Sequence, residues 1–228
     1  MSKRILALLL MLTVWPVTAL AQSPSKEIIL IKAGKLIDVR AGRVLADQAI
    51  LIEGQRIREV GPSASVTAHA QGARVIDLSN ATVLPGLIDC HTHLTSEPGH
   101  TGYSALGISV PREALYGAKN AKITLEAGFT TVRNVGAGGY TDVALRDAID
   151  AGDVPGPRID AAGPAVGVTG GHADNNLLAP EFHSSADGIA DGVPALLNKV
   201  REEVKYGASV IKIVATMTRR ILTATANP

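Results

Sequence analysis

The regular alternation of short apolar segments with helical stretches after Pro85-Gly86 is the feature that most constrains the fold. The apolar segments that predict strands are residues 87–90, 130–134, 158–162 and 209–214. The stretches between them that predict helices are residues 112–127, 142–150 and 193–206, with Thr141 as an N-cap and Gly152 and Gly207 after two helix ends. Strands and helices that alternate at this spacing are typical of βα units around a parallel sheet.

The length of this region indicates about half of a (β/α)8 TIM-type barrel. A complete barrel takes about 250 residues, or roughly 30 for each βα unit. Only 146 residues lie between Val83 and Pro228 (228 minus 82), and they contain the four expected strands. We therefore predict an α/β chain of the (β/α)8 type, truncated after about four βα units. An open doubly wound sheet fits this length better and is the rival fold.

The region before the barrel predicts a small antiparallel sheet. From Glu27 to about Thr82, short apolar segments stand between glycines. Gly54-Gln55 separates two of these segments, and a two-residue connection with glycine first suits a tight hairpin turn. We expect this sheet within residues 22–82, the half-barrel within residues 83–216, and an atypical tail at residues 217–228.

Residues 1–21 have the layout of a secretory signal peptide. Lys3 and Arg4 precede an apolar run at residues 5–14, and Ala19-Leu20-Ala21 is a small-x-small cleavage site. The apolar run is about half of the ~20 residues that a permanent membrane helix needs. We expect cleavage before Gln22 and an exported protein, periplasmic or secreted, with no permanent membrane anchor; an uncleaved anchor is the alternative.

The charge balance and the cysteine count exclude two further classes of protein. With 22 Lys and Arg against 21 Asp and Glu, the formal charge of +1 indicates no electrostatic footprint for nucleic acid. One cysteine, Cys90, rules out an intramolecular disulfide framework.

Two histidines at the end of the first expected barrel strand are candidate metal ligands. His91 and His93 stand two residues apart, and strand side chains alternate between faces, so both imidazoles point the same way. Neutral imidazole nitrogen suits Zn²⁺ and other borderline divalent ions. An ordinary pair of polar strand-end residues is the alternative. Cys90 points to the opposite face, where we expect a small buried residue.

Lys212 and His172 are the other candidate site residues. Lys212 lies in a continuous apolar run typical of a strand covered on both faces, where a lone ammonium costs several kcal/mol. Reaction with carbon dioxide would give a carbamate that can bridge two metal ions. The strand alone favours the alternative, an edge-strand lysine whose ammonium reaches water. His172 follows two glycines and could donate to a substrate carbonyl or carboxylate; ordinary loop polarity is its alternative.

Five linked motifs together resemble the amidohydrolase superfamily, and specifically its imidazolonepropionase-like branch that includes exported Xaa-Pro dipeptidases. The motifs are VLPGLIDCHTHL at residues 83–94, GFTTVR at 128–133, GPRI at 156–159, TGGH at 169–172 and GASVIKI at 207–213. They occur in the family's order, within a resemblance that covers residues 28–216.

The resemblance implies a (β/α)8 barrel flanked by a small β-sandwich that is built partly from residues 28–82. It implies that His91 and His93 bind the first of two divalent metal ions, most often zinc, that Lys212 is the carbamylated bridge, and that His172 helps to hold the substrate. Enzymes of this kind hydrolyse amide bonds with a metal-activated hydroxide. We therefore expect a metal-dependent hydrolase, an exported dipeptidase with a dipeptide or other small molecule as substrate; a cyclic amide hydrolase is the alternative.

The chain also departs from the family pattern. Two later histidines and a proton-handling aspartate have no counterpart, so no catalytic residue is identified, and Asn134 stands where the family pattern has an aspartate. The sequence therefore indicates an inactive truncated form, with a non-catalytic fragment as the alternative from another class. Exact substrate, metal identity and oligomeric state are left open.

Overall fold

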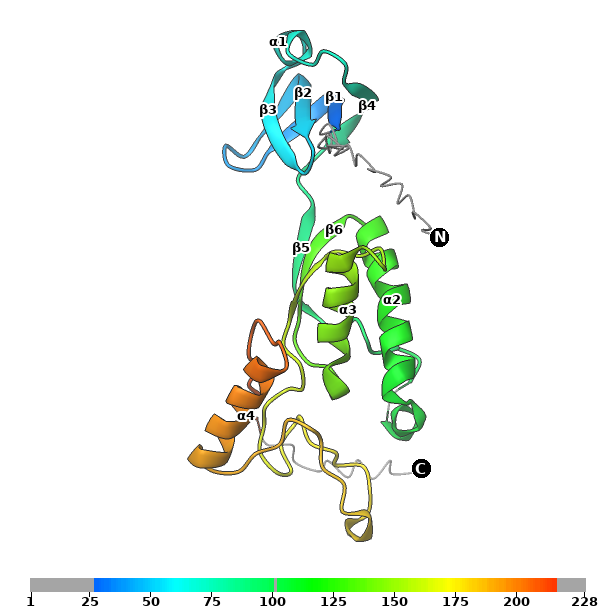
Figure 1. The fold of residues 1–228 in the computed structure, drawn as a ribbon, viewed down its shortest axis with the longest axis vertical. Coiled ribbons are helices and arrows are strands. Elements are labelled where there is room, and N and C mark those ends of the chain that lie inside the picture. Colours follow the sequence, from blue (N-terminus) through cyan, green and yellow to red (C-terminus); the bar gives the residue numbers. More distant parts are fainter. Residues whose placement is uncertain (1–26, 101, 217–228) are drawn as a thin grey trace, which may run out of the picture. The chain divides into compact units, whose positions relative to one another are not determined.

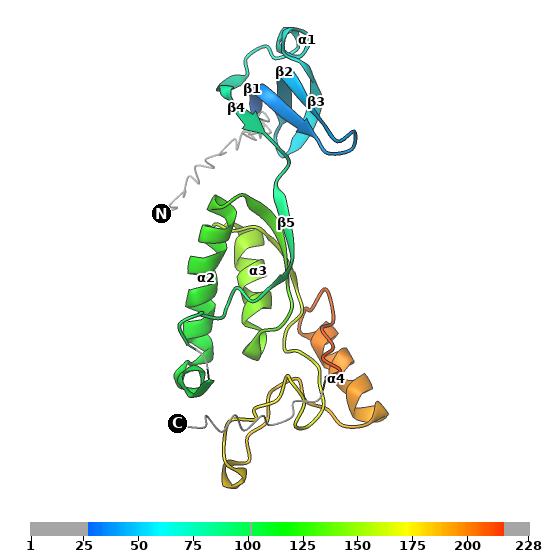
Figure 2. The same ribbon diagram turned by 180° about the vertical axis from the view of Figure 1, so that it is seen from behind.

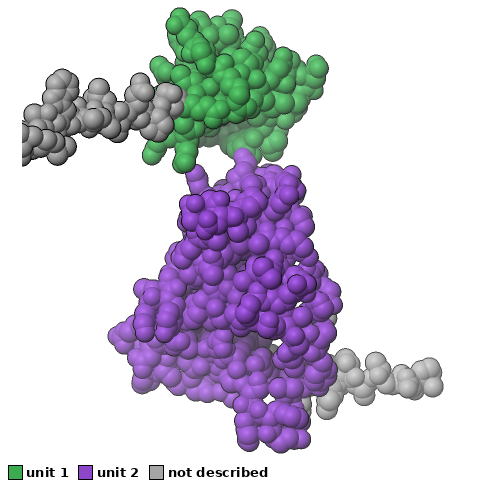
Figure 3. All heavy atoms as spheres, turned by 45° about the vertical axis from the view of Figure 1, so that its right-hand side comes forward, with its two compact units in different colours: residues 1–85 green, residues 86–228 purple. Residues whose placement is uncertain are grey.

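The computed structural model describes residues 27–100 and 102–216 and divides into two compact units, residues 1–85 and 86–228 (Figure 3). The expected leader at residues 1–21 and the atypical tail at residues 217–228 lie outside the described residues. Within the described part of the chain, no helix is both long and apolar enough to cross a lipid bilayer.

The first unit is a four-stranded sheet with the strand order β3-β2-β1-β4 and one short helix (Figure 1). Its elements are β1 (Ile28–Asp38), β2 (Arg43–Glu53), β3 (Arg56–Pro62), α1 (Ser63–Ala68) and β4 (Arg74–Val83). The predicted hairpin turn is confirmed, because Glu53 pairs with Arg56 and Gly54 adopts a positive φ of 60°. Leu30, Leu51 and Val66 form the centre of the core.

The sheet of the first unit is mixed, and the prediction of an antiparallel sheet was wrong for its last strand. β4 pairs with β1 in parallel, from Ile29 with Arg74 to Leu36 with Val83. The reason lies in the connection: after β3 the chain passes through α1 and re-enters the sheet beyond β1, instead of turning back in a hairpin beside β3. A crossover of this kind brings the next strand in parallel.

The second unit is an α/β fold with a three-stranded parallel sheet of order β5-β6-β7, which confirms the α/β class and the parallel sheet of the prediction. Its elements are β5 (Leu87–Thr92), η1 (Gly102–Gly107), α2 (Val110–Glu126), β6 (Phe129–Asn134), η2 (Gly138–Tyr140), α3 (Thr141–Ala151), β7 (Arg158–Ala161), η3 (Pro180–Phe182) and α4 (Val193–Lys205). Figures 1 and 2 show α2 and α3 side by side on the sheet. Ala121, Leu145, Val132 and Ile159 fill the core between these helices and the strands.

The fourth expected strand, residues 209–214, is not a strand in the structure. It runs beside the chain that follows β7, but only Val166 and Ile213 form an isolated parallel bridge. Two backbone hydrogen bonds of 2.8 Å flank this bridge, from Val166 to Lys212 and from Val214 to Val166. The pairing is interrupted because Gly163 has a positive φ of 70° and the following Pro164 has no N–H to donate.

Two smaller expectations were also wrong. The cap of α3 is Tyr140, in a left-handed conformation, and the buried Thr141 instead lies with its hydroxyl 3.1 Å from the Thr95 hydroxyl. Cys90 is exposed, because β5 is an edge strand and none of the described residues covers the side chain. The predicted ends of the helices at Gly152 and Gly207 are confirmed by positive φ angles of 83° and 100°.

Glu203 on α4 is a buried acid that we expect to make the stability of this chain depend on pH. It is fully buried, and burial raises its pKa to about 7 although the Lys199 charge and the Tyr140 hydroxyl act to lower it. Between about pH 4.5 and 7 the folded state therefore holds a proton that the unfolded state has released. The free energy of unfolding should fall by up to about 3 kcal/mol as the pH rises through this window.

Urea denaturation at about pH 5 and about pH 7.5 measures this dependence. Glu203→Gln cannot ionise, so its free energy of unfolding should vary less with pH than that of the wild type. Glu202→Gln is the matched control, because this half-exposed neighbour pairs with Lys199 on the helix surface. Equal pH dependence in the wild type and in Glu203→Gln would contradict the prediction.

Candidate active site

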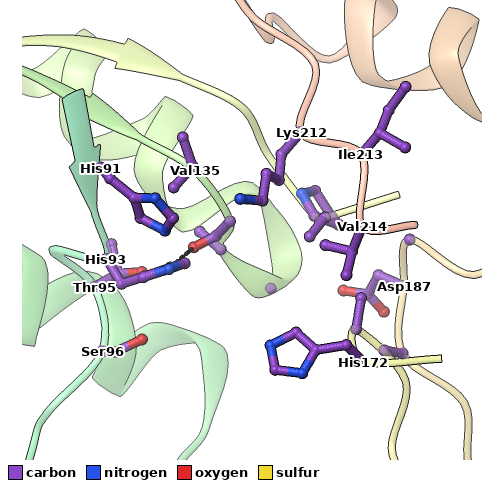
Figure 4. A pocket seen from close by; sticks show the side chains of 18 of the residues that line it. His91, His93, Thr95, Ser96, Val135, His172, Asp187, Lys212, Ile213 and Val214 are labelled. Atoms are coloured by element: carbon purple, nitrogen blue, oxygen red, sulfur yellow. Dashed lines mark hydrogen bonds between the residues drawn. The ribbon is translucent and has the colours of Figure 1, made fainter. Parts of the chain in front are cut away.

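A cavity of about 560 Å³ lies at the carboxyl ends of β5 and β6, next to the loops that follow β7 (Figure 4). All four residues predicted as site residues line it: His91, His93, His172 and Lys212. They come from three segments far apart in the sequence, namely the end of β5, the loop after β7 and the segment after α4. In α/β folds with parallel sheets, this end of the sheet is where ligands bind.

His91 and His93 point into the cavity together, with ring centroids 5.5 Å apart and rings inclined at 63° (Figure 4). Both side chains are exposed to the cavity. The Nδ1 atom of His93 lies 3.1 Å from the carbonyl oxygen of Gly136. A carbonyl oxygen only accepts, so this nitrogen carries the proton and the Nε2 lone pair stays free for a ligand or a metal ion.

Lys212 is half-buried in the wall of the cavity, and its side chain extends toward His91 (Figure 4). Its backbone carbonyl accepts the N–H of Val166, which holds the segment against the chain after β7. It is therefore not in a strand covered on both faces, contrary to the prediction. Within the described part of the chain its ammonium has no ion-pair partner, although the side chain lies in the same cavity as His91 and His93.

His172 is exposed on a loop whose shape depends on the carboxylate of Asp174. The backbone N–H of His172 donates to the carbonyl of Thr216 at 3.0 Å. Partial burial acts to raise the pKa of Asp174, but backbone donors from Gly170, Ala186 and Asn175 outweigh it and hold that pKa below its usual value. The charged carboxylate is thus the stable form, and it fixes the loop that carries His172.

Two acids in the cavity wall had no sequence signal. Glu113 on α2 and Asp187 in the loop before α4 both line the cavity. Burial, and then the charge of Asp187, raise the pKa of Glu113. Asp187 accepts a hydrogen bond from the backbone N–H of Gly139 at 3.0 Å. They lie in separate segments that only the folded chain brings together, so no spacing pattern could have identified them.

A buried network of polar groups ties the ends of the three strands together and was also missed. Asn134, at the end of β6, is fully buried; its Oδ1 accepts the N–H of Leu94 at 2.7 Å and its Nδ2 donates to Asp142 at 3.1 Å. The same oxygen of Asp142 accepts the N–H groups of Ala162 and Gly163 at 3.1 Å each. The asparagine amide supplies both the acceptor for Leu94 and the donor for Asp142 without having to take up a proton.

The match with known proteins decides the family. Residues 82–227, more than half of the chain, match the amidohydrolase family. The chain belongs to the amidohydrolase family. The resemblance inferred from the five motifs is thereby confirmed, and the homologues in this family act on carbon–nitrogen bonds.

Three relatives illustrate how this amidohydrolase chain compares with longer proteins. Ochratoxinase from Aspergillus niger is 28% identical over 215 residues, which are 86% of this chain and 44% of that protein, and its crystal structure superposes with a TM-score of 0.71. The crystal structure of a Xaa-Pro dipeptidase with bound methionine in the active site has a TM-score of 0.73 and 36% identity, over 82% of this chain and 47% of that one. Dihydroorotase from Lactococcus lactis subsp. lactis is 31% identical over 194 residues, 81% of this chain and 41% of that protein. The chain thus spans less than half the length of these relatives.

The residues of this amidohydrolase chain fit part of a divalent-metal site. Within residues 27–100 and 102–216, no group of three or more His, Cys, Asp and Glu side chains is placed to hold a metal ion. His91 and His93 supply two imidazoles in one cavity, and the hydrogen bond from His93 to Gly136 is the support that a ligating imidazole ordinarily has. A lysine is a ligand only after its charge has been removed.

Proposed function

We propose that the protein containing this chain is a metal-dependent hydrolase of amide bonds that acts on a dipeptide. The observation that carries the proposal is the meeting of His91, His93, Lys212 and His172 in one cavity at the carboxyl ends of parallel strands. The 36% identity to a Xaa-Pro dipeptidase supports the choice of a dipeptide. Likewise, the amidohydrolase relatives support a second unit that forms the first part of a (β/α)8 barrel, next to a small β-sandwich portion.

In this proposal, His91 and His93 would hold the first of two divalent ions, zinc for preference, and Lys212 would bridge to the second as a carbamate. The Lys212 ammonium would first lose one proton. The uncharged amine nitrogen would then add to the carbon of carbon dioxide, so that a carbon–nitrogen bond forms as one C=O π bond opens onto oxygen. A second proton would leave the nitrogen, and the carbamate anion would replace the cation. Bound divalent ions would polarise the scissile carbonyl and lower the pKa of a water molecule. His172 would donate a hydrogen bond to the substrate carbonyl or carboxylate.

The acids in the cavity wall favour a dipeptide over a cyclic amide. Glu113 and Asp187 line the same cavity as the four predicted residues, and their carboxylates suit a substrate that carries an ammonium group. A dipeptide has such a group at its N-terminus, whereas a neutral cyclic amide has none. Cyclic amide hydrolysis is therefore the second candidate.

We also propose that the protein is exported, on the strength of the leader-like layout of residues 1–21. The intact mass of the exported chain is the direct test, because a start at Gln22 and a start at Met1 differ by the mass of the leader.

The function is tested by a substrate panel on two forms of the protein. With Zn²⁺ present, we expect a longer form, which carries the remaining length of the relatives, to hydrolyse Xaa-Pro dipeptides. We expect no measurable turnover from the 228-residue chain, because the described residues supply three candidate ligands, too few to hold two ions. Lys212→Ala in the longer form should lower kcat/KM at least about 100-fold, since residues that merely support metal ligands are worth about 10- to 100-fold.

Lys122→Ala is the matched control, because this exposed lysine on α2 pairs only with Glu126. It should leave kcat/KM unchanged. If the longer form hydrolyses cyclic amides but no dipeptide, the dipeptidase hypothesis is wrong and the second candidate, cyclic amide hydrolysis, replaces it. No metal-dependent turnover of either class by the longer form would refute the proposed function.

A further inference from the structure

We propose that Asn134 is a positioning residue that holds the imidazole of His93 in its Nδ1–H tautomer, and that Asp142 holds the amide of Asn134 in the orientation this requires. The proposal rests on the proposed function in one respect only: it assumes that the free Nε2 atom of His93 is the atom that binds the metal ion. The chain of contacts runs from His93 through the Gly136 carbonyl and Asn134 to Asp142.

The first step concerns the carbonyl oxygen of Gly136, which accepts hydrogen bonds from two side chains. His93 Nδ1 lies 3.1 Å from it and Asn134 Nδ2 lies 3.4 Å from it. Gly136 has a φ of 146°, a conformation that favours glycine, and a Cβ there would lie 3.4 Å from the His93 ring. The neighbours of Gly136 are also fixed, since Val135 donates to the Thr92 carbonyl at 3.0 Å and Ala137 to the Gly163 carbonyl at 2.9 Å.

The second step is the orientation of the Asn134 amide, which its partners decide. The N–H of Leu94 can only donate, so the amide oxygen must lie on that side, at 2.7 Å. The carboxylate of Asp142 accepts, so the amide nitrogen must lie on the other side, at 3.1 Å. A flipped amide would lose both bonds inside the protein, where each unpaired polar group costs free energy. In the observed orientation the amide nitrogen also points at the Gly136 carbonyl.

The third step is the rigidity of Asp142. It is fully buried, and its Oδ2 accepts from three donors: Asn134 Nδ2 and the backbone N–H groups of Ala162 and Gly163, each at 3.1 Å. Its other oxygen accepts the N–H of Val143 at 2.9 Å. These four donors fix the carboxylate between α3 and the end of β7, so the acceptor that orients Asn134 cannot rotate away.

The test reads the tautomer of His93 directly, in the metal-free 228-residue chain labelled with ¹⁵N-histidine. Two-bond ¹H–¹⁵N spectra, recorded at a pH where the imidazole is neutral, distinguish Nδ1–H from Nε2–H, and a His93→Ala spectrum assigns the signal. We expect Nδ1–H for His93 in the wild type. Asn134→Leu has a similar size but cannot donate to Gly136 or Asp142, so the Nε2–H form should rise and the Zn²⁺ affinity should fall about 10- to 100-fold.

Asn120→Leu is the matched control. Asn120 donates to the carbonyls of Leu94 and Ser96 at 2.8 and 3.0 Å, on the same segment as His93, but does not contact Gly136. This variant should keep the Nδ1–H tautomer. An Nε2–H signal for His93 in the wild type would overturn the proposal even if Asn134→Leu does not fold. An unchanged tautomer in a folded Asn134→Leu would overturn it too. The tautomer is measured in the absence of metal, whereas the proposed function is tested by substrate turnover. Failure of the proposed function would therefore not change the tautomer result.

Discussion

Replacing both His91 and His93 by alanine is expected to lower the affinity of this chain for Zn²⁺ at least about 100-fold, because residues that merely support metal ligands are already worth about 10- to 100-fold. The two imidazoles share one cavity, and the free Nε2 atom of His93 follows from its hydrogen bond to Gly136. Within the described part of the chain, no group of three or more His, Cys, Asp and Glu side chains is placed to hold a metal ion instead. Competition titration with a chromophoric chelator measures the affinity, and the absorption of bound Co²⁺ reports the ligand set.

The matched control for this prediction is His69→Ala. His69 is an exposed histidine of the first unit, and its Nδ1 lies 2.9 Å from Glu59. Its removal should leave the Zn²⁺ affinity unchanged. An affinity that survives the loss of both His91 and His93, or that falls equally in His69→Ala, would show that the metal binds elsewhere.

Asp142→Ala is expected to lower the free energy of unfolding of the second unit by about 3 kcal/mol or more, because a buried charged acceptor is removed and its donors are left unpaired. Asp142 is fully buried and accepts four hydrogen bonds. The backbone N–H groups of Ala162 and Gly163 would lose their partner at the end of β7. Amide hydrogen exchange at Val132 and Ile159, in the core of this unit, measures its opening separately from the first unit.

Asp147→Ala is the matched control on the same helix. Its carboxylate is exposed and pairs with Arg146 at the surface, where such a pair contributes about 0 to 1 kcal/mol. Hydrogen exchange in the core should therefore be almost unchanged. If Asp142→Ala and Asp147→Ala accelerated exchange equally, the buried network would not be what holds the strand ends together.

The sequence by itself was sufficient for several features whose cause is local. Gly54-Gln55 turns a hairpin, and Gly152 and Gly207 end helices, because positive φ is a property of a single residue. The strand segments that become β5, β6 and β7 follow from apolar runs bounded by turns. The two-residue spacing of His91 and His93 sufficed to predict that their side chains share a side, because strand geometry alternates.

Only the tertiary structure decided the features that depend on neighbours distant in sequence. Residues 209–214 have the composition of a strand, but a strand needs a continuous partner, and Pro164 interrupts the one beside them. Asn134 departs from the family pattern in the sequence, and only the fold shows what its amide does: it accepts from Leu94 and donates to the buried Asp142. Glu113 and Asp187 join the cavity in the same way. Local pattern thus determined most of the elements, whereas the pairing of residues 209–214 and the charge and hydrogen-bonding partners of the site arise only when the elements pack.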